Sequence, residues 1–74
     1  MAFDYSKLLG RIREKGLTQK ELAEQIGISA TTLNLKLCNN NFFTQKEVLK
    51  LCKALDISNG EVADYFFAEK VQKN

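Results

Sequence analysis

The chain has 74 residues, of which 45% are hydrophobic, and its 11 basic and 9 acidic side chains give a net charge of +2. This length admits one domain with one core, and the composition is typical of a globular protein rather than a disordered one. Without histidine the two cysteines cannot complete a zinc site, and no apolar run approaches the roughly 18 residues of a membrane span. We therefore expect a cytoplasmic protein, complete as written, that needs no metal or cofactor and is not an enzyme.

Five helices are expected in an all-α fold, because proline is absent, glycine occurs only 4 times and helix-forming residues are abundant. Each expected start has a polar cap residue, and the apolar residue before it can pack on another one five positions later. The caps are Asp4, Thr18, Ser29, Thr44 and Ser58. Glutamate follows three residues after Thr18, Thr44 and Ser58, which predicts capping boxes there. The predicted helices span about 5–15, 19–26, 30–37, 45–55 and 59–68, followed by a polar tail over 69–74.

Apolar residues recur at helical spacing within each expected helix, and these stripes predict the core. The predicted core residues are Leu8, Leu9, Ile12, Leu22, Ala23, Ile26, Leu33, Leu37, Val48, Leu51, Cys52, Leu55, Val62, Tyr65 and Phe66. We expect the thiols of Cys38 and Cys52 to be buried and unpaired, as in a reducing compartment.

Residues 18–37 contain two short expected helices joined only by Gly27-Ile28-Ser29. Helices joined by so tight a turn cannot lie antiparallel, and a short turn that contains glycine sets them roughly 90–120° apart. Ala23 is small enough for a close crossing, and Gly27 permits a left-handed backbone where the chain leaves the first of the two helices. The spacing therefore predicts a helix-turn-helix.

This segment resembles the repressor and Cro-like proteins of bacteriophages and their bacterial relatives. The residues that carry the resemblance, in the family's spacing, are Gln19, Glu21, Leu22, Ala23, Gly27, Ile28, Ser29 and Leu33. The similarity extends from Leu9 to about Phe67, and TTLNLKL and FTQKEVLKLCKALDIS resemble short regulators of Gram-positive phages and prophages. The resemblance implies a compact five-helix lambda-repressor-like domain. It also implies a transcriptional regulator that binds a palindromic double-stranded DNA operator as a homodimer.

In such a domain the third helix enters the major groove, and the second crosses the phosphates. The residues that the resemblance assigns to DNA binding are Gln19, Ser29, Ala30, Thr31, Thr32, Asn34, Leu35, Lys36, Asn39, Asn40, Asn41 and Lys46. Among them, Ala30, Thr31 and Leu35 would face base edges, and Gln19 would contact a phosphate. The three consecutive asparagines are equally compatible with a role as turn formers alone.

Lys36 and the loop after the third expected helix depart from the family's pattern, and Leu35 is unusual for its position. Lys36 stands where an apolar residue is usual, which puts the last turn of the third helix in question. Leu35 lies nearly opposite Leu33 and is therefore expected at the surface, where leucine suits a protein groove better than DNA. The loop CNNNFF lacks the basic residues that neutralise phosphates, although no acidic residue lies between Glu24 and Glu47 to repel them.

The expected dimer surface is the aromatic end of the fifth helix, because three consecutive aromatic residues cannot all face a small core. Its candidate residues are Val62, Tyr65, Phe66, Phe67 and Val71, for which core packing is the alternative. The alternative function is that of a protein-binding modulator of the anti-repressor type. Such a protein would dock on another repressor protein through the same fold without contacting DNA.

Overall fold

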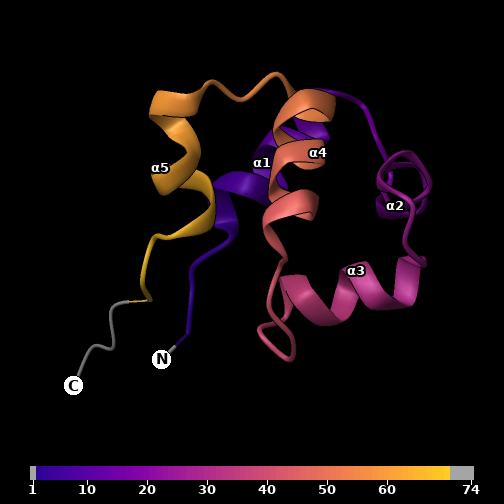
Figure 1. The fold of residues 1–74 in the computed structure, drawn as a ribbon, viewed down its shortest axis with the longest axis horizontal. Helices are drawn as coiled ribbons and strands as arrows, with labels where there is room; N and C mark the ends of the chain where they lie inside the picture. Colours follow the sequence, from indigo (N-terminus) through magenta and orange to yellow (C-terminus); the bar gives the residue numbers. More distant parts are fainter. Residues whose placement is uncertain (1, 71–74) are drawn as a thin grey trace.

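Five α-helices and one 3-10 turn occur in residues 2–70, the part of the chain that the computed structural model describes. The elements are α1 (Ser6–Glu14), α2 (Gln19–Ile26), α3 (Ala30–Leu37), α4 (Gln45–Leu55), the 3-10 turn η1 (Asn59–Glu61) and α5 (Val62–Phe66). In Figure 1, α1 and α4 lie at the centre, with α2 and α3 to one side and α5 to the other. The predicted all-α fold is confirmed, and the bounds of α2, α3 and α4 agree with those expected.

Side-chain caps fix the starts of these three helices. The Thr18 hydroxyl accepts a hydrogen bond from the Glu21 amide at 3.1 Å, and the Glu21 carboxylate accepts one from the Thr18 amide at 3.0 Å. Thr44 and Glu47 form the same capping box at α4, and a serine hydroxyl caps α3. Since these bonds satisfy amides that the first helical turn leaves unpaired, the helix starts follow from local sequence.

The first and last helices differ from expectation. α1 begins at Ser6, later than predicted, and Asp4 accepts hydrogen bonds from the Ser6 amide and hydroxyl at 2.9 and 2.6 Å. The predicted capping box between Ser58 and Glu61 is present, but it opens the 3-10 turn η1 and not an α-helix. α5 ends at Phe66, earlier than predicted, because the chain that follows pairs with the N-terminal segment.

Backbone pairing that was not predicted joins the two ends of the described chain. Phe3 and Glu69 form an isolated antiparallel bridge, and the Asp4 amide donates across the pair to a backbone carbonyl at 2.6 Å. We call residues 2–4 together with 68–70 the terminal clasp. The beginning of the predicted polar tail is therefore paired, while the rest of the tail lies outside the described residues.

The core forms where the helices meet, and it contains most of the side chains that the apolar stripes predict. The buried hydrophobic residues are Tyr5, Leu8, Ile12, Leu22, Ala23, Ile26, Leu33, Leu37, Leu51, Cys52, Leu55, Ile57, Tyr65 and Phe66. Leu9, Val48 and Val62 are only partly buried. Cys52 is buried as expected, but the prediction for Cys38 is wrong: this cysteine is the C-cap of α3, where the chain turns away, and it is exposed.

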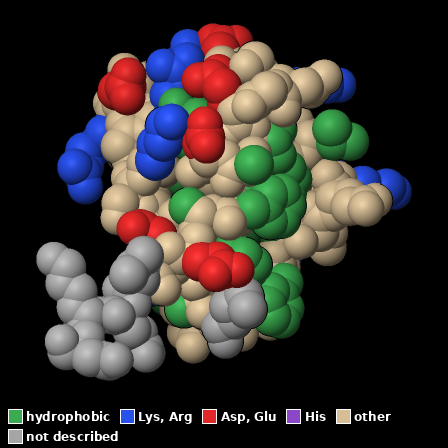
Figure 2. All heavy atoms as spheres, turned by 90° about the vertical axis from the view of Figure 1, so that its left-hand side faces the viewer, with side chains coloured by type: hydrophobic (Ala, Val, Ile, Leu, Met, Phe, Trp, Pro, Cys, Tyr) green, Lys and Arg blue, Asp and Glu red, His purple; other side chains and the backbone are tan. Residues whose placement is uncertain are grey.

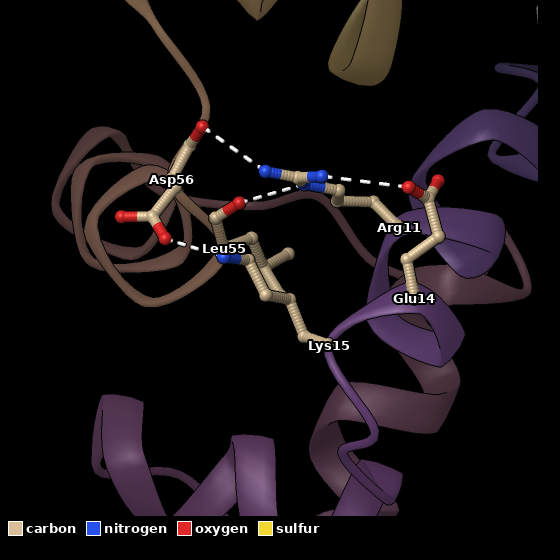
Figure 3. A network of polar contacts seen from close by, with 5 residues as sticks. All are labelled: Arg11, Glu14, Lys15, Leu55 and Asp56. Atoms are coloured by element: carbon tan, nitrogen blue, oxygen red, sulfur yellow. Dashed lines mark hydrogen bonds and ion pairs between the residues drawn. The ribbon is translucent and has the colours of Figure 1, made fainter.

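Basic side chains from α1 and from its C-cap residue bind the C-terminal end of α4 (Figure 3). The Arg11 Nε donates to the Leu55 carbonyl at 2.8 Å, and Lys15 forms an ion pair with Asp56. Asp56 has a φ of 53°, so the chain leaves α4 through a left-handed residue. Positive charge at this end complements the partial negative charge of the last helical carbonyls, which ties α1 to the end of α4.

We expect stability to be nearly constant between about pH 6 and about pH 8, because the chain contains no histidine. Hydrogen bonds from Thr18 lower the pKa of Glu21, and those from Ser58 lower the pKa of Glu61. The Lys15 ion pair lowers the pKa of Asp56. A carboxylate with a depressed folded-state pKa stabilises the fold above its unfolded-state pKa. This stability is lost as the pH falls through the folded-state value.

The expected acid transition therefore begins below about pH 4.5, near the ordinary pKa of glutamate. Urea titrations followed by circular dichroism at a series of pH values measure the free energy of unfolding. A midpoint that changed markedly between pH 6 and pH 8 would contradict the expectation.

Candidate functional site

Two surfaces of the molecule are candidates for a functional site. One is the outer face of α3, which the helix-turn-helix presents, and the other is an apolar groove between α4, α5 and the terminal clasp. Within residues 2–70, no cluster of histidine, cysteine, aspartate or glutamate is placed to hold a metal ion. In the same part of the chain, no helix is long and apolar enough to cross a membrane.

The turn between α2 and α3 has the geometry that its sequence predicts. Gly27 is left-handed, with a φ of 79°, and its amide donates to a carbonyl of the last turn of α2. Ala23 is buried, and Ile28 packs against the core from the turn. Leu33 is fully buried on the inner side of α3, which leaves the opposite side of this helix free to form the outer face.

Most side chains assigned to DNA binding are exposed, and they come from α3, its N-cap, the loop after it and the first turns of α2 and α4. The exposed ones are Ser29, Ala30, Thr31, Asn34, Leu35, Asn40, Asn41 and Lys46. Thr32 and Gln19 are half-buried, and the Asn34 amide donates to the Gln19 carbonyl oxygen at 3.3 Å. The outer face thus brings together short neutral side chains and one leucine, Leu35, whose exposed fraction is 38%.

Lys36 was expected to flank this face as a basic side chain, and the structure shows that it does not. Its side chain is buried, and its ammonium forms an ion pair with the Glu47 carboxylate. Burial raises the pKa of Glu47, but the hydrogen bonds from Lys36 and Thr44 outweigh it, and the net shift is downward. Helix α3 keeps its register because Glu47 neutralises the lysine that stands at an apolar position. In consequence, α3 contributes no free ammonium group to its outer face.

Asn39 has a structural role that the assignment to DNA did not anticipate. Its φ is 65°, a left-handed conformation that asparagine tolerates better than most residues. Its side-chain carbonyl accepts from the Phe3 amide at 2.8 Å, and its side-chain amide donates to the Phe3 carbonyl at 2.9 Å. The backbone conformation of Asn39 agrees with the alternative interpretation, in which the asparagines form a turn. Its side chain also anchors the N-terminal part of the terminal clasp.

The apolar groove was not predicted as a unit. It has a volume of about 620 Å³ and an opening bordered by three exposed side chains, Phe42, Leu49 and Phe67. Their exposed fractions are 78%, 60% and 57%. Figure 2 shows hydrophobic side chains gathered on one face of the molecule, over an area that few charged side chains interrupt. The signal available in the sequence was the pair Phe42-Phe43 in a polar loop, since one of two adjacent aromatic side chains must face solvent.

Aromatic contacts build the floor and walls of the groove. Phe43 packs edge-on against Tyr5 and Phe66, with ring centroids 5.6 and 5.8 Å apart. Phe3 of the terminal clasp packs edge-on against Phe67, with the centroids 6.2 Å apart. Edge-to-face packing at these distances is favourable, so these ring contacts stabilise the shape of the groove.

The aromatic residues assigned to a dimer surface divide between core and surface. Tyr65 and Phe66 are buried in the core of this single chain, which corrects their assignment, because α5 turns both rings inward. Phe67 is exposed as expected, and Val62 is half-buried and lines the groove. Val71 lies outside the described residues.

Comparisons with known proteins show one family match and one closely similar solved structure. A family profile described as "Protein of unknown function (DUF739)" matches residues 1–69. The solution structure of the modulator of repression (MOR) of the temperate bacteriophage TP901-1 from Lactococcus lactis superimposes with a TM-score of 0.77. The two sequences are 39% identical, and the match covers 97% of each chain. A comparison with curated proteins found no match.

Proposed function

Because the chain belongs to the DUF739 family of proteins of unknown function, and is similar throughout to a phage modulator of repression, we propose that it binds a repressor protein and modulates its action. The observation that carries the proposal is the 39% identity over 97% of both chains. The proposed activity is binding and not catalysis, and its proposed setting is the cytoplasm of the bacterial host. The proposed function is thus the protein-binding modulator, which was the alternative expected from the sequence, and not the operator-binding regulator.

The outer face of α3 supports this choice on physical grounds. Nucleic-acid affinity depends strongly on the number of phosphates that basic side chains neutralise. In α3 the only such side chain, Lys36, is already paired with Glu47, and the outer face offers neutral groups and Leu35. Neither these neutral groups nor Leu35 can neutralise a phosphate, so this face is poorly suited to binding DNA. A second function, sequence-specific binding of an operator, retains the support of the helix-turn-helix geometry alone.

Titration with the cognate repressor, meaning the phage-type repressor encoded in the same genome, tests the proposal. We expect an equimolar complex by size-exclusion chromatography with light scattering, together with an altered affinity of the repressor for its operator in fluorescence anisotropy. The chain alone should not shift the operator at micromolar concentration, and scrambled DNA serves as the control. Salt-sensitive operator binding by the chain alone, without a complex with the repressor, would support the operator-binding function and reject the proposal.

A further inference from the structure

We propose that the apolar groove is the docking site for an amphipathic helix of the repressor, whose apolar stripe is bordered by acidic residues. This inference rests on the proposed function, and it adds the surface that binds and the chemistry of the segment that is bound. The case depends on the exposed apolar side chains, on the shape of the groove and on the charges beside it.

The first step is the exposure of large apolar side chains at the groove. Phe42, Leu49 and Phe67 border one opening, whereas Leu35 is the only large apolar side chain that the outer face of α3 exposes within residues 2–70. Single exposed apolar residues are common on protein surfaces, but a contiguous group around a hollow marks an interaction site. The groove is therefore a stronger candidate for the docking surface than the outer face of α3.

The second step is the match between the groove and a helix. The α4 wall is formed by positions 45, 48, 49 and 52, which span two helical turns, or about 10 Å at 1.5 Å per residue. The opposite wall comes from α5 and the terminal clasp. A helix lays side chains spaced by three and four residues into such a groove. Strand addition is disfavoured, because the only strand-like pairing in the described residues is the bridge of the terminal clasp.

The third step is the charge beside the groove. Lys46 and Lys53 lie three residues before and four residues after Leu49, so they are its neighbours on the surface of α4. Both lysines are exposed, and neither forms an ion pair with a described carboxylate. No charged side chain lines the groove itself. A partner with acidic residues beside its apolar stripe would complement this arrangement.

Single aspartate substitutions in the full chain test the assignment against the cognate repressor. We expect Leu49→Asp and Phe67→Asp each to weaken binding about 30-fold or more, as measured by isothermal titration calorimetry, because each places a charge in an apolar contact. Leu49 is 60% exposed, so the thermal midpoint of the free Leu49→Asp variant should change little, whereas Phe67→Asp also removes the ring contact with Phe3. Leu35→Asp is the matched control on the outer face of α3, and we expect its affinity to stay within about twofold of the wild type.

Charge reversal tests the acidic border of the partner helix. Lys53→Glu should weaken binding about fivefold at low salt, and the difference should shrink at high salt. Arg13→Glu makes the same change of charge on an exposed position of α1 that does not line the groove, and it should have little effect. Equal losses from Lys53→Glu and Arg13→Glu would reject the charge complementarity.

The outcomes separate this inference from the proposed function. If Leu35→Asp abolished binding while Leu49→Asp retained it, the docking surface would be the outer face of α3, and modulation of the repressor would still stand. Absence of any complex between the wild-type chain and the repressor would reject the proposed function itself. Self-association of the free chain in sedimentation velocity, abolished by Leu49→Asp, would assign the groove to a second copy and overturn the inference.

Discussion

Replacing Glu47 with alanine should remove a large part of the stability of the folded chain, with an expected loss of about 3–5 kcal/mol. The substitution leaves the ammonium of Lys36 inside the protein without a partner, at a site where only 10% of its side chain is exposed. It also removes the carboxylate that caps the start of α4. A domain of this size has roughly 5–10 kcal/mol in total. Urea unfolding of the variant and the wild type measures the difference.

Two control variants separate the buried charge from the lost cap. Glu21→Ala removes the same capping interaction from α2, where no buried lysine depends on it, and should cost much less. The double variant Lys36→Met with Glu47→Ala replaces the buried ion by an apolar side chain of similar shape, and it should recover most of the loss. If the double variant were as unstable as Glu47→Ala, the cap and not the buried ammonium would explain the effect.

Replacing Asn39 with alanine should cost about 3 kcal/mol, the second largest effect that we expect. Its two hydrogen bonds to the Phe3 backbone are partly buried and contribute about 1 kcal/mol each. The left-handed backbone, with a φ of 65°, adds about 1 kcal/mol of strain for alanine. The free energy of unfolding measured by urea titration checks the total.

Asn39→Gly is the matched control for the two contributions. Glycine adopts the left-handed conformation freely, so this variant loses the hydrogen bonds but avoids most of the strain. We expect it to be more stable than Asn39→Ala by about 1 kcal/mol and less stable than the wild type. If both variants matched the wild type, the anchoring of the N-terminal segment by Asn39 would be disproved.

The parts of the fold that the sequence predicted are those that local interactions determine. The bounds of α2, α3 and α4 followed from the caps at Thr18, Ser29 and Thr44 and from the periodicity of the apolar residues. The shortened α5 was missed because its end depends on pairing between segments more than 60 residues apart, Phe3 and Glu69. Nothing in the local sequence specifies such a contact, and composition marked residues 69–74 only as polar.

The candidate site was predicted in part, for a similar reason. The sequence identified Leu35 as exposed and Lys36 as a charged residue at an apolar position, and both observations are correct. It did not reveal that Glu47, on another helix, would neutralise Lys36, because that pairing exists only after α3 and α4 pack. The groove was missed because Phe3, Phe42 and Phe67 come from three distant segments.

The terminal clasp couples the integrity of the groove to the most distant contacts in the chain. Phe3 and Phe67 line the groove, and they belong to or adjoin segments held by a few backbone hydrogen bonds and by Asn39. Segments of this kind open locally at a smaller free-energy cost than the core. By thermodynamic linkage, a helix that binds only the closed groove must shift the equilibrium of the clasp toward its closed form, and a clasp that opens more readily must weaken the binding of that helix. In the proposed complex, the terminal clasp therefore sets what share of the molecules is ready to bind, although the clasp lies outside the helix-turn-helix.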